Sequence, residues 1–522
     1  MNTIRFSHFA EKNPNALAVV DPSGQQWSRG QVAACANRLS RALRAQGLAP
    51  GDVLAIVAPN CAEYLVVYLA ATQIGLYVVP VNWHLAPPEI QYIIEDCKAR
   101  AIVAHERFGT VMGSILPRMR VRPTIRVSIG AIADFIGLDE FTRDQDCSAL
   151  ADAVQGRVLA YTSATTGKPK GVSLPLSDAD RMLDLSISTR IGVGTLPEEH
   201  VQLCASMLYH GAPLDGAAVG LHMGHAIVLA DRIGPESILE LIERYRVTFA
   251  YIVPAMFSRL LSLSDSVRAR YSTSTLMRVV HAGAPCPVEV KRRMIEWWGP
   301  ILWEAYGAAE GSGTMVGSED WLRYPGTVGK PIPGTRLKIL GEEGEELPPG
   351  KVGTIYMTRF SGDRFEYLGD PDKTRASYRG DFFTVGDMGY VNEEGFLFLC
   401  DRRIDMINLG GMKVYPAEIE GVLVLHPHVA DCAVFGVPDA LTGEAIMAVI
   451  QPAPSAPPAR ELRSAITQFL REHLSIVKIP RYMEWVPELP RDATGKLQKR
   501  RLRERYVAAA SAGPAATAAS PG

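Results

Sequence analysis

The first hundred residues alternate between short apolar runs and segments in which apolar side chains recur at helical spacing. The runs at 17–20, 53–57 and 78–81 have the length and the continuous apolar character of strands buried on both faces. Between the first two runs, apolar residues recur at helical spacing from Val32 to Leu43. This alternation predicts an α/β domain built on a mostly parallel sheet.

Later segments continue this pattern and then depart from it. The runs at 227–229 and 249–253 predict further buried strands. From 325 to 357, short strands separated by glycine and proline turns favour a small β-barrel or meander. Helix and strand alternate again from 421 to 490. Because 522 residues exceed what one core can organise, we expect two or more domains.

Composition and charge argue against several classes of protein. Apolar residues make up 47% of the chain and charged residues 21%, which is ordinary for a globular protein. The net charge of -2 gives no reason to expect nucleic acid or a membrane surface as a partner. The eight cysteines are scattered, which predicts neither a disulfide framework nor a zinc site. Without a signal-peptide core or an apolar run of membrane-spanning length, a cytoplasmic protein is expected.

One stretch, from Tyr161 to Val172, concentrates groups that bind phosphate. It follows an apolar run that we expect to end a strand, and it holds four hydroxyls, two glycines and two lysines within ten residues. Hydroxyls and bare backbone N–H groups donate to phosphate oxygens, glycine permits close approach, and lysine adds positive charge. The spacing is not that of a Walker P-loop. The alternative is a solvated Ser/Thr/Gly loop after a strand.

The order of residues in this stretch is more specific than its composition. It resembles the signature loop of the adenylate-forming superfamily, which comprises acyl-CoA synthetases, peptide-synthetase adenylation domains and luciferases. Eleven of twelve positions agree with the usual pattern, and Ala164 replaces a glycine. The resemblance implies that this loop holds ATP and that Thr166 also takes part in catalysis. The implied ATP-binding residues are Thr162, Ser163, Thr165, Thr166, Gly167 and Lys170.

Three further segments resemble the same family and occur in its order. The turn Gly283-Ala284-Pro285 is similar to one whose backbone contacts adenine. In Tyr306-Gly-Ala-Ala-Glu310, the resemblance implies that Tyr306 stacks on adenine and that Glu310 is catalytic and helps to hold Mg²⁺. Asp387, between two glycines, matches an acid that accepts from both ribose hydroxyls. A plain turn, a strand-end tyrosine with a solvated glutamate, and a turn aspartate are the alternatives.

The segment 397–420 resembles the hinge region of fatty and aryl acyl-CoA synthetases. The resemblance implies that Arg402 reaches ribose or phosphate. It also implies that the backbone of Gly410 and Gly411 lines the pantetheine path, where no side chain can be tolerated. Ile404 stands where the family usually has Asp or Lys at the hinge.

A third long match, Pro490 to Leu497, lies close to the C-terminus. It resembles the family segment that carries a mobile lysine, and Lys496 occupies that position. The resemblance implies that Lys496 is catalytic in the adenylation step.

The acid pocket is also implied by resemblance. Residues 203–214 predict a strand that runs into a loop broken by glycine and proline, and relatives place an aromatic or His side chain there. The alternative is a packed core aromatic beside a surface His. Small residues at Gly211, Ala212, Gly311 and Gly313 leave space for a bulky or cyclic acid. The implied pocket residues are Tyr209, His210 (also catalytic), Gly211, Pro254, Gly307 and Gly311.

The resemblance covers almost the whole chain and implies its architecture. The fold class is α/β, with a large N-terminal domain, 1–400, of two parallel-type sheets with helices and a small β-barrel. A hinge at 401–405 leads to a small mobile α+β domain at 406–507. Residues 508–522 are dominated by Ala, Ser, Gly and Pro and are expected to be disordered.

The implied activity uses ATP and Mg²⁺ to convert a carboxylic acid to an acyl-adenylate, followed by transfer to the thiol of coenzyme A. Two alternatives remain. In the first, the acyl group passes to an amine or to a carrier-protein thiol, and Ala164, Ala309 and Ile404 leave room for altered second-step chemistry. In the second, the chain is a non-catalytic nucleotide- or acyl-binding paralogue that retains Lys496 and Glu310 without using them.

Overall fold

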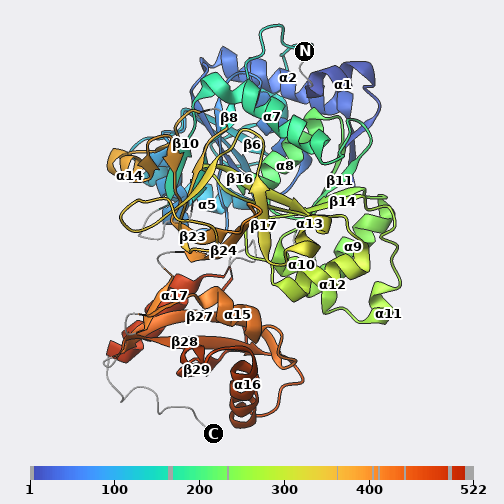
Figure 1. Cartoon of the computed structure of the whole chain (residues 1–522). Helices are drawn as coiled ribbons and strands as arrows, with labels where there is room; N and C mark the ends of the chain where they lie inside the picture. Colours follow the sequence, from blue (N-terminus) through green and yellow to red (C-terminus); the bar gives the residue numbers. More distant parts are fainter. Residues whose placement is uncertain are drawn as a thin grey trace.

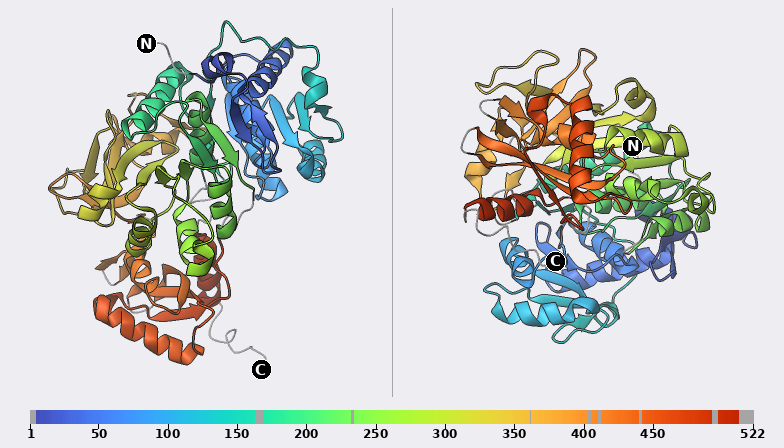
Figure 2. Two further views of the ribbon diagram at one scale, coloured as in Figure 1. Left: turned by 90° about the vertical axis from the view of Figure 1, so that its right-hand side faces the viewer. Right: turned by 90° about the horizontal axis from the view of Figure 1, so that it is seen from below.

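A larger N-terminal body and a smaller C-terminal body make up the molecule (Figure 1). The left-hand view of Figure 2, turned by 90° about the vertical axis, shows the same division. No helix within the described ranges is long and apolar enough to cross a membrane. The computed structural model describes residues 5–162, 169–231, 234–360, 362–402, 405–409, 412–439, 442–491 and 497–511.

Six strands form the first sheet of the N-terminal body, in the order β7-β6-β5-β3-β4-β8. All their pairings are parallel, as continuous apolar runs predict. Their bounds are β3 (Val53–Val57), β4 (Tyr77–Pro80), β5 (Ala101–His105), β6 (Ile125–Ile129), β7 (Ile136–Gly137) and β8 (Arg157–Val158).

The second sheet begins with six parallel strands in the order β1-β12-β11-β13-β14-β15, and β2 (Gln26–Ser28) pairs antiparallel at its edge. Two parallel-type sheets are therefore confirmed. The bounds are β1 (Leu17–Val20), β11 (Val201–Cys204), β12 (Ala226–Leu229), β13 (Phe249–Tyr251), β14 (Arg278–His281) and β15 (Leu302–Ala308).

Antiparallel strands extend this second sheet, in the order β15-β16-β17-β24-β23-β19-β22-β21, with β18 also on β19. The expected small β-barrel is not closed by any pairing among the described residues. The reason is that β17 pairs with both β16 and β24, so these strands prolong the parallel sheet. The bounds are β16 (Gly311–Gly317), β17 (Thr327–Pro331), β18 (Leu337–Leu340), β19 (Gly353–Thr358), β21 (Tyr378–Arg379), β22 (Phe382–Phe383), β23 (Asp387–Val391) and β24 (Leu397–Arg402).

Two helices, α3 (Ala62–Thr72) and α8 (Gly211–His222), share one hydrophobic core with strands of both sheets. Nearly every side chain of α3 is buried, which explains why it is apolar all round. The other helices of this body are α1 (Phe6–Lys12), α2 (Arg29–Ala45), α4 (Pro87–Asp96), α5 (Gly109–Ile115), α6 (Leu138–Thr142), α7 (Ala179–Gly192), α9 (Pro235–Arg244), α10 (Pro254–Leu261), α11 (Asp265–Arg268), α12 (Val288–Trp298), α13 (Ser318–Arg323) and α14 (Pro371–Ala376).

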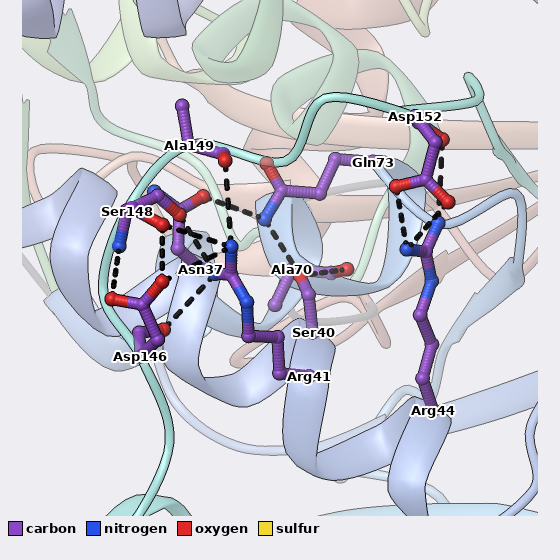
Figure 3. A network of polar contacts seen from close by, with 10 residues as sticks. All are labelled: Asn37, Ser40, Arg41, Arg44, Ala70, Gln73, Asp146, Ser148, Ala149 and Asp152. Carbon is purple, nitrogen blue, oxygen red and sulfur yellow. Dashed lines mark hydrogen bonds and ion pairs between the residues drawn. The ribbon is translucent and has the colours of Figure 1, made fainter.

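A polar network fixes the segment before β8 to helix α2 (Figure 3). Arg41 donates to the carbonyl oxygens of Asp146 at 3.0 Å and Ser148 at 2.7 Å. One turn later, Arg44 pairs with Asp152 at 2.8 Å. Because the sequence gives this segment no regular element, these contacts with α2 determine its path.

The C-terminal body has a five-stranded sheet, mixed in direction, and two hydrophobic clusters of its own. This confirms an α+β region. Helix α17 runs to Ser511, so residues 508–511, expected to be disordered, are helical, in keeping with the high helix propensity of alanine. The bounds are β25 (Ile407–Leu409), β26 (Met412–Val414), α15 (Pro416–Leu423), β27 (Val429–Asp439), β28 (Gly443–Pro452), α16 (Ala459–His473), β29 (Tyr482–Trp485) and α17 (Lys499–Ser511).

Candidate active site

One continuous cleft of about 3190 Å³ collects residues from both bodies. From the C-terminal body it is lined by residues of α15 and by Arg491 and Leu497. Most of the described residues singled out from the sequence lie along it, although they come from elements far apart in the chain. These are Thr162, Tyr209, His210, Gly211, Pro254, Gly283, Ala284, Tyr306, Gly307, Glu310, Gly311 and Asp387.

The signature loop joins two antiparallel strands. Thr162 ends β9 (Ala160–Thr162) and is paired with Lys170, which begins β10 (Lys170–Ser173). On its other edge β10 pairs with β20 (Glu366–Tyr367). Both ends of the loop are thus fixed in a small sheet. Its central residues, with the candidates Ser163, Thr165, Thr166 and Gly167 and the substitution Ala164, lie outside the described residues.

The Lys170 side chain does not line the cleft and is paired with an acidic residue of the protein. Its ammonium forms an ion pair with Asp370. Asp370 also caps α14 by accepting from the backbone N–H of Lys373 at 3.0 Å. The bond from Lys170 and this backbone bond hold the pKa of Asp370 below its ordinary value. To bind a phosphate, Lys170 has to break its ion pair with Asp370.

An aromatic ring and a carboxylate that the sequence predicts to bind the nucleotide are linked within the cleft. The Tyr306 hydroxyl, on β15, donates to Oδ2 of Asp387, the first residue of β23, at 2.7 Å. A ring face suits a purine, and a carboxylate can accept several hydrogen bonds from a diol. Arg402 is the cross-strand partner of Asp387 on β24, and the structure describes its backbone only.

Glu310 lies in the turn between β15 and β16, and its side chain is buried. Its Oε1 accepts from the Tyr367 hydroxyl at 2.7 Å, and its backbone carbonyl accepts from Arg359. Burial, and then the nearby charge of Glu310, raise the pKa of Tyr367, so the phenol stays a donor. Gly311 begins β16 directly after this turn, and a Cβ there would lie 2.8 Å from the Phe383 ring, so the position favours glycine. The carboxylate is therefore held in one orientation.

The chemistry of Glu310 fits a hard cation, because a fixed carboxylate oxygen is a ligand that Mg²⁺ prefers. Within the described ranges, no group of three or more His, Cys, Asp or Glu side chains is arranged to hold a metal ion. The turn at Gly283 has a φ of +85°, and a Cβ there would meet nothing within 4 Å. Glycine is therefore favoured at this position by backbone conformation alone.

Tyr209 and His210 stand at the entrance to helix α8, where His210 is the N-cap residue. Their ring centroids are 4.4 Å apart. Asn60 fixes this segment by donating to the carbonyl oxygen of Ser206 at 3.0 Å and accepting from the Leu208 N–H at 2.8 Å. The backbone just before Tyr209 and His210 is thus anchored to the loop between β3 and α3.

The candidates on the C-terminal body fall largely outside the described residues: Lys496, Gly410, Gly411 and the hinge residue Ile404. The neighbours of Lys496 are described. Arg491 and Leu497 form an isolated antiparallel bridge, and both line the cleft. Arg491 also pairs with Asp431 at 2.6 Å. The described residues on either side of the Lys496 segment, Arg491 and Leu497, therefore both line the cleft.

Sequence reasoning missed several residues in or beside this cleft. Tyr367 and Arg359, which hold Glu310, belong to no recognised motif. Asp215 could have been noticed in the sequence, because it is the one acidic residue of α8, a helix described throughout. Tyr68 and Tyr251 had none, since they lie in apolar runs typical of core elements.

Family models match most of the chain. The model for AMP-binding enzymes matches residues 6–361, and that for the AMP-binding enzyme C-terminal domain matches 418–496. The fatty acid–[acyl-carrier-protein] ligase ScoC of Streptomyces coeruleorubidus is 31% identical over 96% of this chain and 95% of its own. A 3-hydroxybenzoate–CoA ligase of Aromatoleum sp. (strain CIB) is 29% identical over 91% of each.

Solved structures agree with these matches. The anthranilate CoA ligase AuaEII in complex with anthranoyl-AMP has a TM-score of 0.87 and 27% identity, covering 97% of this chain and 98% of that chain. The amide bond synthetase McbA from Marinactinospora thermotolerans has a TM-score of 0.83 and 25% identity, covering 96% and 99%. With its two family models and these full-length relatives, the chain belongs to the family of AMP-binding, adenylate-forming enzymes.

Proposed function

We propose that this protein uses ATP to convert a carboxylic acid to an acyl-adenylate and then transfers the acyl group to the thiol of coenzyme A. The observation that carries the proposal is the joint placement, in one cleft, of the Tyr306–Asp387 pair, the fixed Glu310 carboxylate and the Tyr209–His210 pocket. A nucleotide site and an acid site that share a cleft can bring a carboxylate to a phosphorus atom.

In the first step, a carboxylate oxygen of the acid attacks the α-phosphorus of ATP. The bond from that phosphorus to the bridging oxygen breaks, and pyrophosphate leaves with the electron pair. Because both reactants are anions, positive charge at the site is required. Glu310, oriented by Tyr367, would hold Mg²⁺ together with phosphate oxygens, and bound Mg²⁺ neutralises phosphate charge.

The chain's own residues supply the remaining charge and the orientation. Donors of the signature loop, between Thr162 and Lys170, would hold the phosphates. Tyr306 and Asp387 would fix adenosine by stacking and by accepting from the ribose. Lys496 would approach the leaving group, which is consistent with the position of its neighbours Arg491 and Leu497 along the cleft.

In the second step, the thiolate attacks the carbonyl carbon and AMP leaves with the carboxylate-derived oxygen. The two-domain division, residues 1–400 and 406–507 with a hinge at 401–405, would allow the smaller domain to rotate between the steps. That rotation would withdraw Lys496 and bring the backbone of Gly410 and Gly411 to the pantetheine path.

Coenzyme A is the favoured acceptor because several relatives are named as CoA ligases, for 3-hydroxybenzoate, long-chain fatty acids and ferulate. A carrier-protein thiol is the second candidate. It is favoured by ScoC, which is named as a ligase for an acyl-carrier protein and is 31% identical to this chain.

The test is acid-dependent pyrophosphate release with ATP and Mg²⁺, followed by mass analysis of the products with each acceptor. We expect pyrophosphate and AMP with a subset of acids, and an acyl thioester when coenzyme A is added. A thioester formed only with a phosphopantetheinylated carrier protein would support the second candidate. Absence of pyrophosphate with every acid would contradict adenylation and favour a binding role.

A further inference from the structure

The acid-binding part of the cleft contains one carboxylate that the proposed mechanism does not use. Asp215 lies on α8, four residues after Gly211, so the two share a helix face with a separation of about 6 Å along the axis. Helix α8 packs beside α7 in the N-terminal body (Figure 1). Both Gly211 and Asp215 line the cleft. A substrate that enters past Gly211 would therefore extend toward Asp215.

The Asp215 carboxylate accepts no hydrogen bond and makes no direct ion pair among the residues that the structure describes. Two arginines act on it at longer range, and each donates to the backbone elsewhere. Arg190 donates to the carbonyl oxygen of Gly216 at 2.8 Å, and Arg157 donates to that of Pro175 at 2.8 Å. The arginines moderate the charge of Asp215 and leave its oxygens able to accept from a ligand.

Two phenols border the same part of the cleft. Tyr68 from α3 and Tyr251 at the end of β13 both line it, and their rings are buried. Burial, and then the charge of Asp215, raise the pKa of each hydroxyl, which places both within electrostatic reach of that carboxylate. Neither hydroxyl has a hydrogen-bond partner within the described ranges. A purely apolar acyl group would leave all three groups unsatisfied.

We propose that the acid substrate carries a hydrogen-bond donor, an amine or a hydroxyl, at the end remote from its carboxyl group, and that Asp215 accepts from it. The inference rests on the proposed function, since it names the class of acid that the site activates. Asp215 is exposed to the cleft, so a bound acid covers it and removes its access to solvent, and a donor on that acid restores the lost hydrogen bonding. A second carboxylate at that end would be repelled by Asp215.

The first test compares acids that differ only at the remote end. One series is 4-aminobenzoate, 4-hydroxybenzoate, 4-methylbenzoate and terephthalate, and the other is 6-aminohexanoate, 6-hydroxyhexanoate, heptanoate and pimelate. We expect kcat/KM for pyrophosphate release to favour the donor over its apolar counterpart about 10- to 100-fold in the series that fits, with the diacid slowest. Equal or better rates with the apolar acids in both series would overturn the inference and leave the proposed function standing. Pyrophosphate from no acid would instead overturn the proposed function.

The second test replaces Asp215 and measures how the preference for donor-bearing acids changes. Asp215→Leu should remove the preference for the donor and raise the relative rate of the apolar acid. Asp215→Asn, which keeps an acceptor oxygen without the charge, should lose more of the preference for the amine than for the hydroxyl. Asp265→Asn, at an exposed residue of α11, is the matched control and should leave the ratio unchanged. Thermal melts check that each variant is folded. A wild-type ratio of donor to apolar acid in Asp215→Leu would contradict the inference.

Discussion

The two sides of the cleft differ in how their polar groups are partnered. On the side proposed to bind the nucleotide, Asp387 accepts from Tyr306 and Glu310 accepts from Tyr367, so the protein itself fixes both carboxylates. On the side proposed to bind the acid, Asp215 accepts from no described residue. We infer that the protein orients its own carboxylates where the ligand is always ATP. Where it has to choose between acids, it leaves a carboxylate able to accept a hydrogen bond from the substrate.

The strongest disturbance of the nucleotide side should come from Lys496→Ala. Removing its charge should slow adenylation by on the order of 10²–10³-fold, measured as pyrophosphate release. Thioester formation from synthetic acyl-adenylate should change little, because that step needs no charge at the leaving pyrophosphate. All acids should be slowed by the same factor, since Asp215 is intact. If the rate reduction differed from acid to acid, the nucleotide and acid sides of the cleft would not act independently.

The next effect concerns Glu310 and the phenol that orients it. Glu310→Gln should lower kcat about 10²-fold, and Tyr367→Phe should raise the Mg²⁺ concentration needed for half-maximal rate about tenfold. The measurement is a Mg²⁺ titration of pyrophosphate release at saturating ATP. An unchanged Mg²⁺ dependence in both variants would show that Glu310 acts in another way.

A smaller effect is expected for Tyr306→Phe, which keeps the ring and removes the 2.7 Å bond to Asp387. Loss of a hydrogen bond to a charged group should raise KM for ATP about tenfold with little change in kcat. The ranking of acids should stay that of the wild type. If the ranking changed, adenosine binding and acid selection would be coupled.

The smallest expected effect is on stability, and it is a gain, whereas the substitutions above cause losses of activity. Asp215 is exposed to the cleft, but desolvation by the surrounding protein raises its pKa, so this group favours folding below its unfolded pKa of about 3.8, and that contribution, weakened by solvent screening, is lost as pH rises through the folded pKa. Asp215→Asn should therefore raise the melting temperature slightly at pH 7–8, and the gain should vanish toward pH 4. Melting curves across this range test the prediction. A lower melting temperature at pH 8 would mean that the protein itself stabilises the carboxylate.

The sequence predicted much of the fold because buried parallel strands leave continuous apolar runs. It could not predict that the strands after residue 325 prolong the second sheet, because the pairing of β17 with β16 and β24 depends on partners distant in sequence. Propensity identifies a strand without identifying its neighbour.

The sequence predicted those site residues that belong to a recognisable local motif. Tyr306, Glu310 and Asp387 stood out by their local pattern, and all line the cleft. The partners of such residues were not predictable, since Tyr367 reaches Glu310, and Asp370 reaches Lys170, only through tertiary packing. Asp215 lay between these cases: a lone acid in an apolar helix is visible in the sequence, but what it faces is not.

The central claim is that the carboxyl group of an acid becomes an ester of AMP, and oxygen transfer tests it most directly. An accepted acid labelled with ¹⁸O in both carboxylate oxygens is turned over with ATP and coenzyme A, and the nucleotide product is weighed. Attack of the carboxylate on the α-phosphorus predicts AMP that carries one ¹⁸O atom. Unlabelled AMP, or ADP as the nucleotide product, would contradict the account.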